Sequence, residues 1–351
     1  MDGDFEVARW AGGKALLNQR LCCLTPHASL DAAFLAFLLP TPLKIINDLT
    51  GSTTVKHLSS FDILKIRFPL PPPQVQANIS AFLEAVTGRI DRLLTEKRRL
   101  LGLLAEKRKA IIAKAVTGGV DPNAKMRDSG VPWLGEMPAH WELWKVGHLA
   151  RVGNGSTPDR DKMAYWTGGT FPWLNSSVVN RDEVTSSDQF VTEMALRECH
   201  LPSLQPGTVL VALTGQGKTR GQAVVLSIEA TINQHMAFVV PDAKLMSAWF
   251  LRWSFCRAYE YLRSISDDAG GTKGALTCEE VASLRVPVPQ LQEQHAIVEH
   301  IARETAKLDA VRAATERTIA LLEERRAALI AAAVTGQLDV GSGEVLARSA
   351  G

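Results

Sequence analysis

The segment GQGKT at residues 215–219 has the glycines and lysine of a phosphate-binding loop, whose full pattern is G-x-x-x-x-G-K-[ST]. That pattern needs a glycine five positions before Gly217, where this sequence has Ala212, so we do not expect nucleotide binding. The loop instead offers side chains that can contact phosphates or the base edges of nucleic acid. These are Gln216, Lys218, Thr219 and Arg220. A solvated hairpin loop is the alternative.

Three further polar stretches have side chains suited to the same contacts. The candidates are Arg160, Lys162 and Tyr165 in GNGSTPDRDKMAYW, Asn175, Ser176 and Ser177 in WLNSS, and Lys273 in GGTKG. Asparagine is suited to adenine, but asparagine and serine are also common turn residues. Lys273 could meet a phosphate or belong to a loop that only turns the chain.

The sequence has no arrangement that indicates catalysis of its own. Its eight histidines form no H-E-x-x-H motif and its five cysteines form no C-x-x-C pair. We find neither a nucleophile next to a general base nor paired catalytic carboxylates. We therefore expect no catalytic residue, no metal ion and no cofactor on this chain.

Composition and targeting signals favour a cytoplasmic protein without a membrane segment. Of 351 residues, 46% are hydrophobic and 22% are charged, as in globular domains. No apolar run reaches the ~18 residues of a membrane span, and no export signal follows Met1. Residues 138–290 hold 14 Lys and Arg against 15 Asp and Glu, so a basic DNA-binding face would require the fold to segregate these charges.

An internal repeat organises the chain. A shift of 218 positions aligns residues 66–118 with residues 284–336 without a gap, and 20 of the 53 positions are identical. Each copy begins with a proline-rich segment and ends on Ala-Val-Thr-Gly. Within each copy, a heptad-like run connects the proline-rich segment to the Ala-Val-Thr-Gly end. In the first copy its apolar residues include Ile79, Leu83, Ile90, Leu93 and Leu104.

This pattern predicts two long helices. Each would have about forty residues and a length of roughly 60 Å. Each is expected to end at a glycine, Gly118 or Gly336, because glycine adopts the left-handed C-terminal cap at little cost. We expect the two helices to pack on each other within the chain, with separate outward arms as the alternative.

The segment between the helices is predicted to be a mixed α/β domain. GTVLVALTG and GQAVVLSIEATINQHMAFVVP have the composition of strands, and KLMSAWFLRWSFCRAYEYLRSI that of a helix. Near the amino end, LLNQRLCCLTP parallels TINQHMAFVVP, and GSTTVKHLS parallels GGTKGALTC. Residues 1 to about 60 are therefore expected to be the back portion of the same domain type, without its front half. Whether Met1 is the true start stays open.

The order of these pieces resembles the specificity subunit of type I restriction–modification systems. The residues that carry the resemblance are RFPLPPPQVQANI and RVPVPQLQEQHAI before the helices and KRKAIIAKAVTG and RRAALIAAAVTG at their ends. DSGVPWLGEMPAHWE resembles the family's junction, and FPWLNSSVV, ALTGQGKTRGQAVVL and INQHMAFVVP resemble pieces of its recognition domain. The resemblance covers nearly the whole chain.

The resemblance implies an α+β fold, in which mixed α/β target-recognition domains are joined by two long antiparallel coiled-coil helices. Residues 1–62 would be the partial first recognition domain, residues 63–119 the first conserved region with its long helix, and residues 120–140 a linker. Residues 141–283 would be the second recognition domain, residues 284–338 the second conserved region with its long helix, and residues 339–351 a flexible tail.

The resemblance also implies a function. The chain would be a non-catalytic subunit that recognises half of a split sequence in double-stranded DNA. The resemblance therefore favours DNA contact, over a merely solvated hairpin, for the polar loops. Its helices would fix the gap between half-sites and dock methyltransferase subunits, and a motor-nuclease subunit would join for restriction. S-adenosylmethionine and ATP would bind the partner subunits. A homodimer through the helices is also left open.

Two other interpretations stay open. The chain could be a truncated scaffold or adaptor of the complex that has lost sequence-specific DNA binding. It could also come from a partial gene that serves as a reservoir for recombination.

Overall fold

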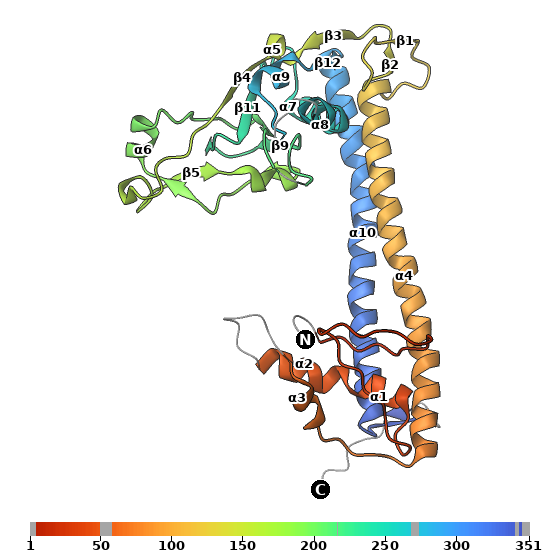
Figure 1. The fold of residues 1–351 in the computed structure, drawn as a ribbon. Helices are drawn as coiled ribbons and strands as arrows, with labels where there is room; N and C mark the ends of the chain where they lie inside the picture. Colours follow the sequence, from red (N-terminus) through yellow and green to blue (C-terminus); the bar gives the residue numbers. More distant parts are fainter. Residues whose placement is uncertain (1–4, 50–57, 216, 268–273, 341–343, 346–351) are drawn as a thin grey trace. The chain divides into compact units, whose positions relative to one another are not determined.

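The computed structural model describes residues 5–49, 58–215, 217–267, 274–340 and 344–345. The chain forms two compact units. Unit 1 consists of residues 1–103 and 311–351, and unit 2 of residues 104–310. Figure 1 labels the helices and strands of both.

Two long helices pair side by side, as the repeat predicts (Figure 1). Helix α4 spans Pro73–Gly118 and helix α10 spans Leu291–Val334. In unit 1, Arg326 of α10 donates to Asp91 of α4 at 2.8 Å, and Arg98 of α4 donates to Glu323 of α10 at 2.8 Å. Arg98 lies after Asp91 on α4, whereas its partner Glu323 lies before Arg326 on α10. The two helices are therefore antiparallel. The predicted fold class is confirmed.

The helix seam differs from the prediction at one leucine. Ile79, Leu83, Ile90 and Leu94 of α4 are buried, whereas Leu93 is 51% exposed. Spacings of three and four residues fit either member of the Leu93–Leu94 pair, so periodicity alone could not choose between them. Part of this seam, with α10, forms the core of unit 1, whose buried residues are Phe34, Leu38, Ile79, Leu83, Ile330, Ala333, Val334 and Leu338.

The helix ends also differ in detail. Gly118 is the last residue of α4, and the left-handed position belongs to Gly119, with φ of 72°. The prediction that Gly118 caps this helix is therefore wrong by one residue. Gly336 has φ of 71° beyond the end of α10, as predicted.

The duplication extends to a buried glutamine near the start of each helix. In unit 2, Nε2 of Gln294 donates to the carbonyls of Leu245 and Pro289, both at 2.9 Å, and its Oε1 accepts from the Ser247 amide at 2.8 Å. In unit 1, Gln76 makes the same three bonds, to the Ser29 carbonyl at 3.0 Å, the Pro71 carbonyl at 2.7 Å and the Asp31 amide at 2.8 Å. Both side chains are fully buried. Each glutamine thus ties its helix to the segment that precedes a short helix of its own unit.

Unit 2 is built on a five-stranded sheet with the order β4-β11-β8-β9-β6. The strands are β4 (Ala150–Asn154), β11 (Met236–Pro241), β8 (Val209–Ala212), β9 (Ala223–Leu226) and β6 (Glu183–Val184). Strand β11 is antiparallel to both β4 and β8, and β6 is parallel to β9. The strands predicted in GTVLVALTG and GQAVVLSIEATINQHMAFVVP are present.

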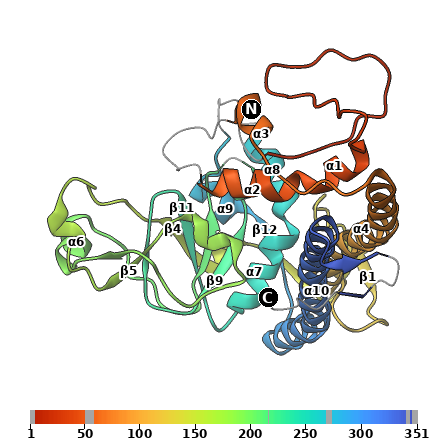
Figure 2. The ribbon, with the colours of Figure 1, turned by 90° about the horizontal axis from the view of Figure 1, so that it is seen from below.

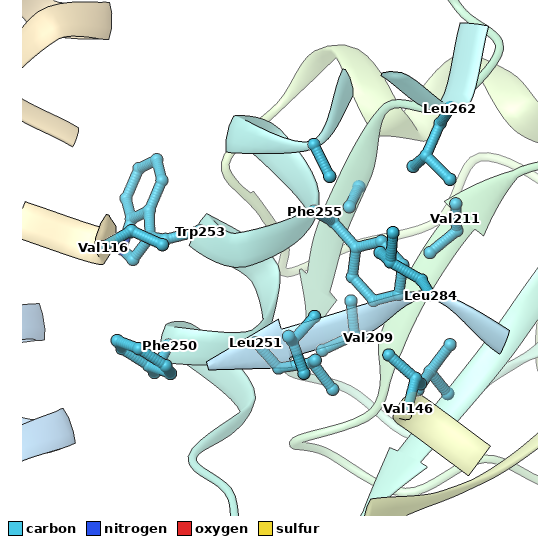
Figure 3. Packing of buried hydrophobic residues seen from close by; sticks show 14 of the residues in the cluster. Val116, Val146, Val209, Val211, Phe250, Leu251, Trp253, Phe255, Leu262 and Leu284 are labelled. Atoms are coloured by element: carbon cyan, nitrogen blue, oxygen red, sulfur yellow. The ribbon is translucent and has the colours of Figure 1, made fainter. Parts of the chain in front are cut away.

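Apolar side chains alternate between the two faces of this sheet. Val209 and Val211 of β8 face a core shared with α7 (Ala248–Arg257) and α8 (Tyr259–Asp267), part of which Figure 3 shows. Leu210 and Ala212 face a second core on the other side. The sequence predicted one helix here, and the structure has two, which meet at Ala258.

Smaller elements complete unit 2. A sheet with the order β10-β5-β7 consists of β10 (Thr231–Ile232), β5 (Phe171–Leu174) and β7 (Phe190–Val191). Strands β3 (Glu142–Lys145) and β12 (Arg285–Val288) pair antiparallel. The remaining helices are α5 (Val146–Leu149), α6 (Glu193–Glu198), α9 (Cys278–Ser283) and the 3-10 helices η1 (Met163–Tyr165) and η2 (Ser176–Asn180).

The segment predicted to be a linker, residues 120–140, is a folded part of unit 2. Strands β1 (Met126–Asp128) and β2 (Glu136–Pro138) pair antiparallel. Trp133 and Met137 are buried in the core that contains β8 and α7. Its content of proline and glycine reflects tight turns around buried apolar residues, so composition alone misled the prediction.

Unit 1 is mainly helical in the part that the structure describes. Its short helices are α1 (Ala32–Leu38), α2 (Pro40–Leu49) and α3 (Ser60–Leu64). Of the predicted tail 339–351, Asp339 belongs to β13 (Leu338–Asp339), which pairs with β14 (Glu344–Val345). Residues 341–343 and 346–351 lie outside the described residues. No helix in the described part of the chain carries an apolar window long enough to cross a membrane.

Candidate nucleic-acid interface

Three polar loops of unit 2 meet at one end of the five-stranded sheet. They are the loop after β4, the loop between β8 and β9, and the turn between β10 and β11. The amide of Ser156 donates to the Ile232 carbonyl at 3.1 Å, and the amide of Leu213 donates to the His235 carbonyl at 2.9 Å. These bonds join the loops through their backbones, so the structure places them together although they are distant in sequence.

Glycine is required where the first loop crosses the third. A Cβ atom built on Gly155 would lie 1.8 Å from the Ile232 carbonyl oxygen. Beside this crossing, the hydroxyl of Thr157 donates to Oε1 of Gln234 at 2.5 Å. Because Gly155 has no side chain, the loop can pass close to Ile232, and this places Thr157 beside Gln234.

The loop between β8 and β9 is held from behind by helix α8. The hydroxyl of Tyr259 donates to the Lys218 carbonyl at 2.9 Å, and the guanidinium of Arg263 donates to the Gly217 carbonyl at 2.5 Å. Gly215 and Gly217 both have positive φ, of 138° and 81°, so this path suits glycine. The Lys218 side chain is exposed on a loop whose backbone is fixed.

Arg220 holds this loop from inside and is only 4% exposed. Its guanidinium donates to the Asp267 carboxylate and to the Gly274 carbonyl, the latter at 2.5 Å. The position is therefore structural, and the side chain is not available to a phosphate on the surface. The sequence predicts Arg220 as a DNA contact together with its loop neighbours. That prediction is wrong, because the direction of a loop side chain cannot be inferred from the local sequence.

Two further residues belong to this interface. Gln234 and His235 are exposed in the turn before β11, beside Thr157 and the end of β8. The sequence pattern predicts His235 as a packed strand residue, and that prediction is wrong. The Asn-Gln pair that recurs near both copies of the repeat was the signal that could have identified Gln234. The predicted residues Gln216 and Lys273 lie outside the described residues.

Arg160 lies on a separate aromatic cluster of unit 2. Its guanidinium carbon is 4.1 Å from the Trp166 ring centroid and 4.7 Å from that of Trp173. It also donates to Oε1 of Gln189 at 3.2 Å. Stacking on two indoles orients the guanidinium while leaving the residue exposed. The arrangement suits contact with a phosphate or a base.

Lys162 and Tyr165 are engaged with a carboxylate. The Lys162 ammonium donates to Glu198 at 2.8 Å and to the Tyr165 hydroxyl at 2.7 Å, and that hydroxyl donates to Glu198 at 2.7 Å. Hydrogen bonds from Lys162 and then Tyr165 lower the pKa of Glu198. The hydrogen bond to Glu198 is the main cause that raises the pKa of Lys162. The charge of Lys162 is thus balanced locally, which reduces its attraction for a phosphate.

The WLNSS stretch caps a short helix. Oδ1 of Asn175 accepts from the Ser177 amide at 2.9 Å and so caps η2. Bidentate recognition of adenine needs both the carbonyl and the amino group of an asparagine. The cap uses one of the two lone pairs of that oxygen and fixes the orientation of the Asn175 amide. Ser176 and Ser177 lie in the first turn of η2, with Ser177 exposed.

A charge cluster ties this part of unit 2 to helix α4. The Asp182 carboxylate accepts from Arg252 of α7 at 2.6 Å and from Arg108 of α4 at 2.7 Å. The ring centroid of Trp253 is 3.8 Å from the guanidinium carbon of Arg252 and 5.7 Å from that of Arg108. Burial acts to raise the pKa of Asp182, but the charges of Arg252 and Arg108 outweigh it and lower the pKa.

We expect Asp182→Asn to destabilise unit 2 by about 1–2 kcal/mol at neutral pH, since charge-assisted hydrogen bonds are lost at a half-exposed carboxylate. A lowered pKa means that the stabilisation is complete above the unfolded-state pKa and is lost as pH falls through the folded-state value. The difference in unfolding free energy between wild type and Asp182→Asn should therefore close below about pH 4. Urea unfolding from pH 7 to pH 3, with the exposed Asp188→Asn as control, measures it. A gap that stays constant across this range would contradict the assignment.

Comparison with known proteins agrees with this architecture. The solved chain from work on complex assembly and conformational transition of the type I R-M system superposes with a TM-score of 0.68 at 18% identity. The superposition covers 88% of this chain and 72% of that chain, and it shows the fold. The chain therefore shares with that solved chain a fold that contains a mixed α/β domain and two long helices.

Sequence comparison identifies the family. The model of the Type I restriction modification DNA specificity domain matches residues 3–101 and 138–316, and the chain belongs to this family. The type I restriction enzyme EcoBI specificity subunit of Escherichia coli is 24% identical over 351 residues, which cover 96% of this chain and 72% of that protein. The EcoR124I/EcoR124II specificity subunit of Escherichia coli is 26% identical over 159 residues, which cover 44% of this chain and 39% of that protein.

Proposed function

We propose that this protein is the non-catalytic DNA specificity subunit of a type I restriction–modification complex. Unit 2 recognises one half-site in double-stranded DNA, and the long helices dock the methyltransferase subunits. S-adenosylmethionine binds those methyltransferase subunits, and ATP binds a motor-nuclease subunit that joins for restriction. Family membership supports the general role, and the interface of unit 2 supports the half-site.

The observation that carries the proposal is the convergence of three loops on a fixed backbone. Lys218, Thr157 and Gln234 lie on loops that hydrogen bonds hold together at one end of the sheet. A lysine supplies affinity through phosphate, while threonine and glutamine side chains can bond base edges. Arg160 adds a stacked guanidinium on the neighbouring aromatic cluster. Fixed polar groups of this kind suit sequence recognition, because a mobile loop would pay an ordering cost on binding.

Docking through the helices has separate support from exposed apolar residues. Leu93 and Leu103 of α4 and Val311 and Leu321 of α10 are each 46–65% exposed. The 218-residue shift pairs Leu93 with Val311 and Leu103 with Leu321. Exposed apolar side chains at matching places on both helices suit two equivalent contacts with partner subunits.

Lys218→Ala tests the DNA interface. We expect it to weaken binding to target DNA about 3- to 10-fold and to reduce the slope of log affinity against log salt by about one, because one phosphate contact is lost. Lys244→Ala is the matched control, since Lys244 is exposed beyond the other end of β11. Fluorescence anisotropy of the purified chain with its methyltransferase subunits, over a salt series, measures both quantities.

A second experiment distinguishes the proposal from the scaffold alternative. Methylation sequencing of a host with the gene, compared with the same host without it, should show one defined half-site in every sequence whose modification depends on the gene. A chain that binds methyltransferase subunits but supports no sequence preference in DNA would instead be an adaptor. Equal weakening by Lys218→Ala and Lys244→Ala would place the DNA elsewhere on the protein.

A further inference from the structure

The guanidinium of Arg160 lies in a corner formed by two tryptophan rings. The rings of Trp166 and Trp173 meet edge to face at 83°, with centroids 5.3 Å apart, and the guanidinium carbon is 4.1 Å and 4.7 Å from them. Trp173 belongs to β5, whose Leu174 packs on the face of the five-stranded sheet opposite to α7. In Figure 2, β4 and β11 of that sheet lie between β5 and α7. Folded structure therefore supports the side chain of Arg160.

The loop that leads to Arg160 is fixed by the same two tryptophans. The indole N–H of Trp166 donates to the Asp159 carbonyl at 2.9 Å, and that of Trp173 donates to the Ser156 carbonyl at 3.2 Å. Between these two anchored residues lies Thr157, which bonds Gln234 in the three-loop interface. Arg160 is thus three residues from that interface on a loop of fixed backbone, and it extends the same surface.

The hydrogen bonds of Arg160 leave one edge of its guanidinium available. Nη1 and Nη2 both donate to Oε1 of Gln189, at 3.3 Å and 3.2 Å. An acceptor that both terminal nitrogens share almost equally lies at the distal end of the group. Arginine has five N–H donors in a fixed plane. Among the described residues, Gln189 is the hydrogen-bond partner of this side chain, so the parallel N–H groups of Nε and Nη2 remain for a ligand.

The charges beside this edge favour a neutral acceptor over a phosphate. Asp159 and Asp161 flank the arginine in sequence and are exposed, and Asp188, also exposed, precedes the glutamine that binds it. The nearby ammonium of Lys162 is balanced by Glu198 at 2.8 Å. Three carboxylates would repel a phosphate, which carries a full negative charge. The edge of a base offers acceptor atoms without a net charge.

Two parallel donors select among the bases. In the major groove, guanine presents the acceptors N7 and O6 side by side, and a bidentate arginine is their commonest specific partner. Adenine presents an amino donor beside its N7 acceptor, so one N–H of the arginine would meet another N–H. We propose that Arg160 recognises one guanine of the half-site through its Nε and Nη2 edge. The inference rests on the proposed function of unit 2 and deepens it by naming a base.

Selection from a randomised duplex library by the purified chain with its methyltransferase subunits tests this. Wild type should select a half-site with at least one invariant guanine. Arg160→Ala should lower the preference for guanine about 5- to 150-fold at one position and leave the other positions unchanged. Arg151→Ala is the matched control. Arg151 is an exposed arginine near the start of β4 that stacks on Phe238 at 5.0 Å, and its loss should leave the half-site as in wild type.

Replacement of each guanine of the selected half-site by 7-deazaguanine, which lacks the N7 acceptor, gives a second measurement on the unaltered protein. At one position it should weaken binding by wild type about 3- to 10-fold, because one hydrogen bond is lost. The same replacement should not weaken binding by Arg160→Ala further, since the arginine that uses N7 is already absent. Circular dichroism of Arg160→Ala should match wild type, because the residue is exposed.

The proposal would be overturned in any of three ways. Arg160→Ala could keep every base preference and reduce the slope of log affinity against log salt by about one, which would make Arg160 a phosphate contact. It could change neither quantity, which would place Arg160 off the DNA. Finally, 7-deazaguanine could weaken wild type at no position, or weaken wild type and Arg160→Ala equally. A wild-type complex that selects no sequence at all would instead refute the proposed function itself, and the inference with it.

Discussion

Trp141→Ala is expected to lower the free energy of unfolding of unit 2 by about 3–5 kcal/mol, the cost of removing a large buried aromatic side chain. Trp141 is 1% exposed, and its indole N–H donates to Glu293 at 2.9 Å. Its ring meets Phe250 edge to face, with centroids 6.4 Å apart, and lies under Gly119 at the end of α4. The substitution would leave a cavity where the start of α10, the end of α4 and α7 meet.

Urea unfolding followed by tryptophan fluorescence measures this effect, because every tryptophan except Trp10 belongs to unit 2. Trp10→Ala is the matched control. Trp10 is 73% exposed and lies in unit 1, so the same substitution should leave the stability of unit 2, which the remaining tryptophans report, within about 0.5 kcal/mol of wild type. A cost for Trp141→Ala below about 1 kcal/mol would mean that this junction is not packed as described.

Gln294→Leu is expected to destabilise unit 2 by about 2–4 kcal/mol. Leucine fills a similar volume but leaves the Ser247 amide and the carbonyls of Leu245 and Pro289 without their partner, and each unsatisfied buried group costs about 1–3 kcal/mol. Leu245 is partly exposed, so water can replace part of its loss. The same reasoning predicts a similar loss for Gln76→Leu in unit 1.

Gln292→Leu is the matched control, since Gln292 is exposed on the same turn of α10 and its change should stay within about 0.5 kcal/mol. Amide hydrogen exchange of α7 and α1 would resolve the two units separately. Gln294→Leu should speed exchange in α7 and Gln76→Leu in α1. If either variant behaved like Gln292→Leu, its three hydrogen bonds would not stabilise that unit.

Much of the fold follows from local and periodic features of the sequence. The repeat at a shift of 218 residues predicted both long helices, because an apolar spacing of three and four defines a helix face without reference to the rest of the chain. The strands of GTVLVALTG and INQHMAFVVP followed from β-branched runs bounded by glycine and proline. The choice between Leu93 and Leu94 did not follow, since it depends on where the partner helix lies.

The candidate site was predictable in composition and not in arrangement. The sequence predicts the polar loop at Lys218 as a candidate DNA contact, because it departs from the phosphate-binding pattern and offers polar side chains. That contact stays a prediction. Arg220, three residues after Gly217, proved to be buried against Asp267 and Gly274. Which way each side chain of a loop points depends on elements that are distant in sequence, here α8 and the residues after it.

The sequence by itself determined that the protein has two equivalent long helices, each following a proline-rich segment, and that GQGKT departs from the phosphate-binding pattern at Ala212. These features are repeats and short motifs, so they are readable in order along the chain. Only the tertiary structure decided that Thr157, Lys218 and Gln234 come together. Their meeting depends on the pairing of strands far apart in the chain, and no local preference specifies such pairing.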